Sequence, residues 1–483
     1  MATHTTEQEQ LIRLAFEAPK GFEAVAWQDV KRFLPPSAVE AAGSSSHVKL
    51  LSGWILLALP AGPVLDSFLS RYAEGSFWAV TRVLLSLHTE QDALQDLPAL
   101  SPEICEGLEE ERKNLPSKRS RQIINPNISK SKNTRYRRRV APLDMDTTLF
   151  ELAFVERLTA IAETQRNSHE TIYTIWKKAR RCNQVEEVVH SDPRNFAVRF
   201  ERREFLFPTL KSAKISFYLA EHYGTQIVSF SGKEGLKADL MSPEYEIVTE
   251  LVQEDGTWLF LSGINLPKPK TPKHRLDRIR GRTTLLPERA YCLCMMHPEL
   301  RSLEKHSKAM LFLDPCSGLG SIPLEIAAIA KRDGKKIATL SADNELPSLE
   351  NAAVNSSNSN VGLSTGLLGL DKGLLWTGLG KPRSGGFRQG ILDGVVTDLP
   401  WGIRELSANA IAALYPALLR FLGEAVTDGG IGAFLCQRDR VFLAAVQSNY
   451  RVWEVLEQQP ANVEGVQVYI FLIRRKSRTA VDV

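Results

Sequence analysis

Apolar runs alternate with helical periodicity over the second half of the chain. Four runs are each followed by a helix-like segment: AMLFLD (309–314), KIATLSAD (336–343), ILDGVVTD (391–398) and GIGAFLCQ (430–437). Two further runs near the end, RVWEVLEQQ (451–459) and VQVYIFLIRR (466–475), predict a hairpin. This order predicts an α/β fold with a doubly wound, mostly parallel sheet and an antiparallel edge.

The first half carries two shorter α+β patterns. In residues 1–100, GFEAVAWQDVKRFL (21–34) is amphipathic and HVKLLSGWILLAL (47–59) is strand-like. In residues 146–266, we expect helices at 149–165 and at 209–224, the second closing on Gly224. Strands are expected at 195–205, 225–230, 245–253 and 256–264. This order is typical of a compact sheet with helices on one face.

Composition and charge narrow the class of protein. The 483 residues suit roughly two to four domains, and 43% hydrophobic with 24% charged residues is typical of soluble globular proteins. The net charge of +4 is uneven, because residues 112–139 hold eleven Lys or Arg and no acid. We interpret 101–145 as a basic linker or insertion, and 267–282 as a second basic linker between domains. A polyanionic partner is the simplest explanation, with nuclear import through KRSR (118–121) and RYRRR (135–139), or solubility alone, as alternatives.

Several classes of protein are disfavoured. The six cysteines form no CxxC pair, so neither a disulfide framework nor a zinc site on this chain is expected. The N-terminus lacks the apolar stretch of a signal peptide, and the most apolar window (50–65) is short and carries two prolines. We therefore expect a protein of the cytoplasm or the nucleus, without a membrane span.

Ligands of such a sheet bind beyond the carboxyl ends of its strands, where this chain places acids and glycines. Asp314 ends a run that leads into Gly318 and Gly320, a strand–turn–helix setting that favours a nucleotide-like ligand over a simple tight turn. Asp343 ends the next run and either accepts ribose hydroxyls or caps the following helix. Asp371 is a third candidate acid near the adenine edge, or a loop residue.

A third strand end reads VVTDLPWGIR (395–404). Asp398 leaves a buried strand, Pro400 stiffens the turn, and Trp401 offers a flat face for a base. An exocyclic amine could give one hydrogen to Asp398 and another to a nearby carbonyl. The alternative is a purely structural role, in which the turn ends the strand and the indole packs against the protein.

These parts together resemble the class I S-adenosylmethionine-dependent methyltransferases that methylate amino groups. The match is closer to the THUMP-domain RNA guanine-N2 methyltransferases, whose D-x-P-[FW]-G motif is matched at 398–402. GRTTLLPERAYCL (281–293), LYPALLRFL (414–422) and KADLMSPEYEIVTEL (237–251) are similar to other segments of that family. Leu399, Ser317 and Leu319 depart from the wider motifs.

The resemblance implies a domain order and a cofactor. It implies an N-terminal ferredoxin-like unit (1–100), a THUMP RNA-binding domain (146–266) and a Rossmann-like domain with a seven-stranded, mostly parallel sheet (283–478). The implied cofactor is S-adenosyl-L-methionine, and no metal is implied. The cofactor residues would be Asp314, Gly318, Gly320, Asp343, Asn344, Asp371, Thr283 and Thr284.

The implied reaction is methyl transfer to the exocyclic N2 of a guanosine in tRNA, with Asp398, Pro400 and Trp401 as catalytic residues. Related enzymes grip the 3′ end of tRNA through the THUMP domain and work with a small zinc-containing activator subunit, for which 364–379 is the candidate sheet edge. The RNA-binding candidates are Arg199, Arg202, Arg203, Lys273, Arg275 and Arg280. The alternatives are an amino-methylase acting on a small nuclear RNA guanosine, adenine N6 or a protein glutamine, and a catalytically silent RNA-binding protein.

Overall fold

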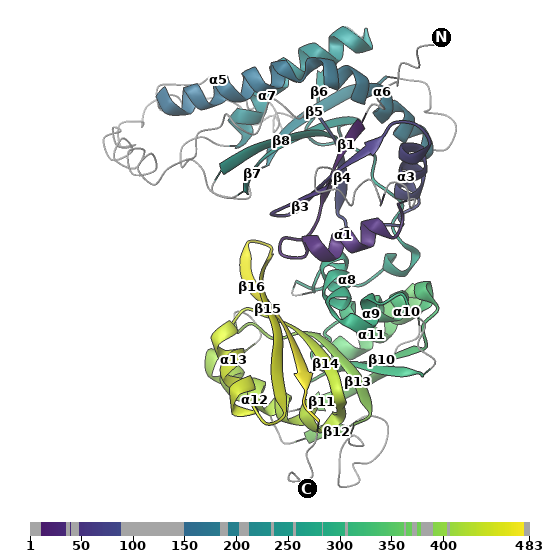
Figure 1. Ribbon diagram of the computed structural model, residues 1–483, viewed down its shortest axis with the longest axis vertical. Helices are drawn as coiled ribbons and strands as arrows, with labels where there is room; N and C mark the ends of the chain where they lie inside the picture. The colour runs from purple at the N-terminus through teal and green to yellow at the C-terminus, as the bar shows by residue number, and fades with distance from the viewer. Residues whose placement is uncertain are drawn as a thin grey trace, which may run out of the picture.

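The computed structural model arranges the chain around two large sheets, one above the other in Figure 1. The N-terminal sheet and its helices form the upper part, and the C-terminal sheet forms the lower part. No helix among the residues described is long and apolar enough to cross a membrane. The structure describes residues 11–34, 39, 48–87, 149–183, 192–201, 212–232, 236–254, 257–282, 284–304, 308–361, 364–369, 374–377, 390–402 and 406–477.

The upper sheet joins both predicted N-terminal units. Its strands are β1 (Leu11–Glu17), β2 (Val48–Leu51), β3 (Trp54–Pro60), β4 (Arg82–Ser86), β5 (Asn195–Glu201), β6 (Lys237–Ala238), β7 (Tyr245–Glu254) and β8 (Thr257–Asn265). Their order is β2-β3-β1-β4-β8-β7-β5-β6, and β4 pairs antiparallel with β8 through Leu84 and Asn265. The units at 1–100 and 146–266 therefore share one continuous sheet.

The helices of this part are α1 (Glu23–Lys31), α3 (Pro63–Ala73), α5 (Leu149–Thr164), α6 (Arg166–Asn183) and α7 (Ser212–Ser231). Two expectations on α7 are wrong, because the helix runs through Gly224 and the strand expected at 225–230 is its last part. Leu219, Tyr223 and Ile227 are buried at helical spacing. Gly224 is there because the helix approaches the sheet closely: a Cβ would lie 2.8 Å from Cζ of Phe196.

The lower sheet has the predicted doubly wound topology, with one strand more than the seven expected. Its order is β12-β11-β10-β9-β13-β14-β16-β15. Strands β9 to β14 are parallel wherever they pair with each other except at the β11–β12 edge, and β16 runs antiparallel to β14 and β15. The bounds are β9 (Met310–Asp314), β10 (Ile337–Asp343), β11 (Ser364–Gly369), β12 (Leu374–Thr377), β13 (Leu392–Asp398), β14 (Val426–Cys436), β15 (Trp453–Val463) and β16 (Val466–Arg475).

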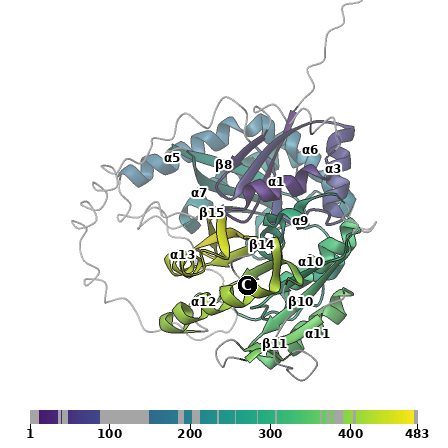
Figure 2. The same cartoon turned by 60° about the horizontal axis from the view of Figure 1, so that its bottom comes forward.

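Helices cover both faces of the lower sheet, as Figure 2 shows from another side. On one face lie α8 (Pro287–Met296) and α10 (Ser321–Asp333), and on the other α12 (Ala408–Ala425) and α13 (Asp439–Ser448). The short α9 (Pro298–Arg301) follows α8, and α11 (Leu346–Ser359) follows β10. Alternate residues of β13 enter the two cores, Val396 on the first face and Val395 on the second.

Direct contacts join the two parts. The β15–β16 hairpin projects from the lower sheet toward α1 (Figure 1), where the amide of Asn462 donates to the carbonyl of Lys20 over 3.0 Å. Asp29 of α1 is fully buried and accepts hydrogen bonds from the amide of Trp78, at 2.8 Å, and from the hydroxyl of Tyr291 in α8, at 2.6 Å. The N-terminal sheet thus lies at a set position above the lower sheet.

A Gly224→Ala substitution tests the close approach of α7. In an ordinary helix interior, alanine stabilises by roughly 0.5–1 kcal/mol relative to glycine. Here the added Cβ would press on the ring of Phe196, and overpacking costs about 1–3 kcal/mol. We expect a lower free energy of unfolding in urea denaturation followed by circular dichroism. A variant more stable than the wild type would contradict this packing.

Candidate active site

Three aspartates lie at the carboxyl ends of neighbouring parallel strands. Asp343 is the last residue of β10, Asp314 of β9 and Asp398 of β13, and β9 pairs with both of the other strands. From β9 the chain runs outward through β10, β11 and β12, and it then returns to β13 on the other side of β9. Such a reversal of strand order is where doubly wound sheets bind their ligands.

Asp314 is the most deeply buried of the three. It is 1% exposed, and its Oδ1 accepts a hydrogen bond from the amide of Cys316 over 3.1 Å. Burial raises the pKa of this carboxyl well above its ordinary value, and the charges of Asp343 and Asp398 raise it further. The hydroxyl of Thr397 lies near enough to lower the pKa somewhat, yet neither Thr397 Oγ1 nor Asp314 Oδ2 completes a hydrogen bond. The Asp314 carboxyl therefore keeps one oxygen without a complete hydrogen bond inside the protein.

The glycine turn lies between β9 and α10. Gly318 and Gly320 have φ of 51° and 83°, a left-handed conformation that glycine adopts without strain. The space where a Cβ of Gly318 would point is open within 4 Å. Asp343 holds the turn, because its Oδ2 accepts from the amide of Gly318 over 2.8 Å and its Oδ1 from the amide of Glu345 over 3.0 Å. The alternative that Asp343 caps the following helix is wrong, because the N-cap residue of α11 is Glu345 and α11 has no side-chain capping bond.

Of the remaining cofactor candidates, Asn344 is exposed directly after β10. Thr284 lies in the segment before α8, where its Oγ1 accepts a hydrogen bond from the amide of Gly281 over 2.8 Å. A Cβ on Gly281 would lie 3.3 Å from Cδ1 of Leu319, so this segment lies against the glycine turn. Thr283 and Asp371 are outside the residues that the structure describes.

Asn355 is a residue that the sequence gave no reason to select. It lies in α11, 1% exposed, and its amide makes three hydrogen bonds. Oδ1 accepts from the amide of Ile279 over 2.6 Å, while Nδ2 donates to the carbonyls of Ile279 and Leu319, each over 3.0 Å. Asn355 thereby ties the interdomain linker to the glycine turn. An asparagine in an amphipathic helix carries no local signal of such a role.

Hydrogen bonds hold the turn after β13 at Leu399 and at Trp401. The amide of Leu399 donates to the carbonyl of Leu435 over 2.8 Å, the last backbone bond of the strand pair. Trp401 Nε1 donates to Asp398 Oδ1 over 2.8 Å. Sequence reasoning expected the indole to offer its face to a base. In the structure, the edge of the indole donates to the acid and the ring packs partly buried against the core, as the alternative expected. A stack between the ring and a base stays a prediction.

The RNA-binding candidates are scattered. Arg199 of β5 is paired with Glu246 and donates through Nη2 to the carbonyl of Leu240 over 2.7 Å. Lys273 and Arg280 of the linker are exposed. Arg202, Arg203 and the basic run at 112–139 lie outside the described residues.

The assignment of Arg275 to RNA binding is corrected by the structure. Arg275 is buried, and its guanidinium binds Glu325 of α10 through Nε, at 3.1 Å, and through Nη2, at 3.0 Å. His274 and Arg278 reach the same carboxylate at 3.3 and 3.1 Å. Burial alone would raise the pKa of Glu325, but Arg275 and its neighbours outweigh burial and lower it. In sequence, this arginine cannot be told from the exposed basic residues around it.

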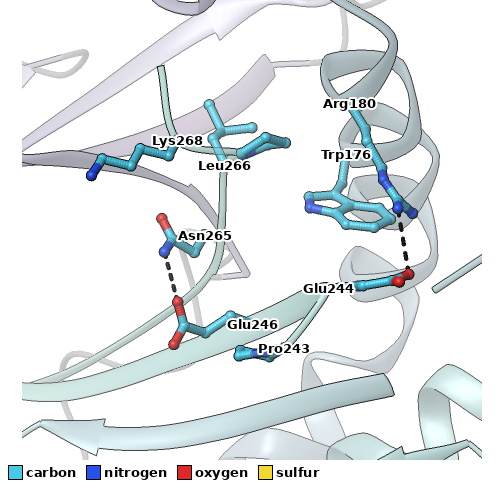
Figure 3. A pocket seen from close by; sticks show the side chains of 9 residues that line it. Trp176, Arg180, Pro243, Glu244, Glu246, Asn265, Leu266 and Lys268 are labelled. Atoms are coloured by element: carbon cyan, nitrogen blue, oxygen red, sulfur yellow. Dashed lines mark hydrogen bonds and ion pairs between the residues drawn. The ribbon is translucent and has the colours of Figure 1, made fainter. Parts of the chain in front are cut away.

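A pocket of about 300 Å³ lies in the N-terminal part, away from the strand ends of the lower sheet (Figure 3). Arg180 pairs with Glu244 on one side, and Asn265 Nδ2 donates to Glu246 over 2.7 Å on the other. Asn265 Oδ1 is buried without a hydrogen-bonding partner. The lining combines these groups with Trp176, Leu266 and Lys268, so it includes carboxylates, cations and apolar side chains.

Comparisons with known proteins agree with this geometry. Residues 385–468 match the family UPF0020, described as an RMKL-like methyltransferase domain. A Bos taurus protein named tRNA (guanine(6)-N(2))-methyltransferase THUMP3 is 24% identical over 255 residues, 51% of this chain and 46% of that protein. The Homo sapiens protein of the same name is 25% identical over 246 residues, 50% and 44% of the two chains. The chain thus spans about half the length of the curated relatives it matches.

Solved structures match over nearly the whole chain. TrmN from Thermus thermophilus has a TM-score of 0.51 at 15% identity, covering 96% of this chain and 99% of that one. SMU.472, a methyltransferase structure complexed with SAH, has a TM-score of 0.51 at 10% identity, covering 98% and 100%. At these identities the likeness shows the fold, and the predicted Rossmann-like methyltransferase fold is confirmed.

Proposed function

We propose that this chain, which the domain match, the relatives and the structural neighbours support as one of the THUMP-containing tRNA methyltransferases, methylates the exocyclic N2 of a guanosine in tRNA with S-adenosyl-L-methionine. One observation carries the proposal. The glycine turn after β9 and the Asp398-Leu399-Pro400-Trp401 turn after β13 end neighbouring strands of the same sheet.

The strand ends of β9 and β10 fit the cofactor. Asp314 Oδ2 is a buried acceptor without a donor, and the open space beside Gly318 leaves the backbone accessible. Asp343 would accept ribose hydroxyls, Thr284 lies in the segment that packs against the glycine turn, and Asn344 is exposed directly after β10. When bound, S-adenosyl-L-methionine supplies an electrophilic methyl group on a sulfonium.

The turn after β13 fits the nucleophile. The N2 amine of guanine is a poor nucleophile because its lone pair is delocalised into the ring. Asp398 would accept a hydrogen bond from one N–H group of this amine. That bond would orient the amine and stabilise the positive charge that develops on nitrogen. A guanine stacked in a duplex cannot reach this turn, so the base has to be unstacked or flipped. Trp401, held at its edge by Asp398, would then lie beside the base.

Substrate capture is assigned to the N-terminal part. We propose that the pocket of Figure 3 holds the 3′ end of the tRNA, because Lys268 lines it with a positive charge that suits the phosphates of an RNA terminus. Glu246 connects this pocket to Arg199. Lys273 and Arg280, exposed on the linker, would contact backbone phosphates.

A partner and a location complete the proposal. The β11–β12 pair forms the edge of the lower sheet where a small zinc-containing activator subunit could add a strand. Co-purification of such a subunit with the full chain would test this. An active purified enzyme without the subunit would refute a requirement for it.

We propose the cytoplasm or the nucleus as the location, which imaging of the tagged full chain would test.

The decisive measurement is mass spectrometry of tRNA nucleosides from cells that lack the protein. We expect the loss of N2-methylguanosine at one position and its return on re-expression. Loss of a methylated adenosine, or unchanged tRNA with altered small nuclear RNA, would identify another amino group as the target. Unchanged nucleosides together with RNA binding would identify a silent RNA-binding protein.

Asp398→Ala is expected to abolish methyl transfer to tRNA, because the amine loses its orienting acceptor, while affinity for S-adenosylhomocysteine survives in part. Asp428→Asn serves as the control, since Asp428 lies near the start of β14, at the opposite end of the sheet. Methylation kinetics with purified tRNA and calorimetric binding separate the two effects. Near wild-type turnover in Asp398→Ala would refute the assignment.

Asn355→Asp is expected to weaken cofactor binding, because a carboxylate cannot donate to the carbonyls of Ile279 and Leu319. Loss of bonds to buried carbonyls costs about 1–3 kcal/mol, so the dissociation constant for S-adenosylhomocysteine should rise about tenfold or more. Asn358→Asp is the matched control: Asn358, exposed on the same helix, makes one bond to the linker, to the carbonyl of Asp277 over 2.9 Å. Equal affinities for the two variants would contradict the role given to Asn355.

Removing the 3′-terminal nucleotides of the tRNA is expected to raise KM for the RNA by about tenfold with little change in kcat, because the contact binds ground state and transition state equally. Lys268→Ala should move KM in the same direction, since Lys268 lines the pocket. Transcripts shortened at the 5′ end provide the control. An unchanged KM for the trimmed RNA would place its 3′ end elsewhere.

A further inference from the structure

The turn that follows β13 is held by two side chains from other elements. The hydroxyl of Tyr415, in the middle of α12, donates to the carbonyl of Pro400 over 2.7 Å. Arg438, the residue before α13, donates through Nε to the carbonyl of Trp401 over 3.2 Å. Tyr415 is fully buried and its ring packs edge-on against Phe442 with ring centres 6.0 Å apart.

This turn cannot be held by strand pairing. Pro400 has no amide hydrogen to give to a neighbouring strand, and the bond from Leu399 to Leu435 is the last of the ladder. Gly402 follows with φ of 76°, and a Cβ there would lie 2.6 Å from Cδ1 of Ile411. Beyond Leu399, the direction of the Pro400 and Trp401 carbonyls therefore depends on Tyr415 and Arg438.

We propose that Tyr415 and Arg438 are positioning residues for the methyl-accepting amine, an inference that rests on the proposed function. A carbonyl oxygen has two lone pairs, and the Tyr415 hydroxyl occupies one of them at Pro400. This bond fixes the peptide two residues after Asp398, the acid that would orient the amine. Arg438 holds the backbone of Trp401, and the indole of Trp401 in turn holds Asp398 Oδ1.

The two bonds thus hold successive residues of the same turn. Tyr415 sets the direction of a carbonyl, and Arg438 sets the direction of the carboxylate through Trp401. Neither residue is expected to touch the base. Rate enhancement through orientation is sensitive to displacements of about 1 Å, so loosening either support should lower turnover more than binding.

Tyr415→Phe tests the first support, because it removes one oxygen and keeps the ring. We expect kcat for methylation of tRNA guanosine to fall about five- to tenfold, as one neutral hydrogen bond is worth about 1 kcal/mol. KM for the RNA and affinity for S-adenosylhomocysteine should stay within about twofold. Tyr469→Phe is the matched control: Tyr469 lies on β16 and accepts a hydrogen bond from Gln467 over 3.1 Å.

Arg438→Lys tests the second support. Lysine keeps the positive charge, so attraction of the RNA is retained, while the planar Nε donor is lost. The same split is expected, with a lower kcat and an unchanged KM. A charge-only role for Arg438 would instead leave Arg438→Lys fully active.

The outcomes separate the two levels of the proposal. The assignment would be supported if the wild type and Tyr469→Phe methylate tRNA at the same kcat and Tyr415→Phe has a lower kcat. Wild-type kcat in Tyr415→Phe would overturn the positioning role and leave the proposed function standing. The positioning role would also be overturned if Tyr415→Phe lowered the melting temperature and weakened cofactor binding by the same factor as it lowered kcat. That result would show general damage to the fold. A wild-type protein that binds S-adenosylhomocysteine without methylating any tRNA would overturn the proposed function, and the positioning role with it.

Discussion

A single buried carboxylate, Glu325 of α10, ties the two parts of the molecule together. An unpaired charge at a fully buried position would cost several kcal/mol, so the acid requires cations beside it. The linker supplies them through Arg275 and Arg278, while His274, whose pKa is lowered by burial, contacts the same carboxylate. Because α10 begins at the glycine turn, the linker has to dock where the sheet is expected to bind its cofactor. The position of the N-terminal sheet follows from that docking.

The other contacts between the parts reinforce this arrangement. Asp29 joins α1 to α8, and the β15–β16 hairpin reaches the loop before α1. The β4–β8 pairing makes one sheet of the N-terminal half, so the pocket beside Asn265 is connected to the same framework. If RNA is held at that pocket, the fold itself sets how far the target guanosine lies from the Asp398 turn. A change in the linker would then alter which nucleotide reaches the site.

The strand ends of the lower sheet concentrate negative charge at a cost. Burial raises the pKa of Asp314 and Asp343, and the first retains an acceptor atom without a donor. Such groups lower the stability of the fold and are kept where a ligand binds to them. Shifted pKa values therefore gather at functional sites. The turn after β13 is arranged differently: its polar groups are held by Trp401, Tyr415 and Arg438. The acids at the ends of β9 and β10 are thus left for a ligand to bind, whereas the turn after β13 is held in place by the protein itself.

Local patterns were sufficient for four strands of the lower sheet and for their ends, but not for the last part of α7. Alternating apolar runs predicted β9, β10, β13 and β14, and the acids that end three of them followed from the same runs, because strand period and turn chemistry are properties of neighbouring residues. Contacts between distant residues left no such trace. Gly224 is a helix interior residue because Phe196 lies against it, Arg275 is buried because Glu325 faces it, and Asn355 and Tyr415 act on backbone far away in the chain. Each of these roles depends on which surfaces meet after folding, and the pattern of neighbouring residues in the sequence does not reveal those contacts.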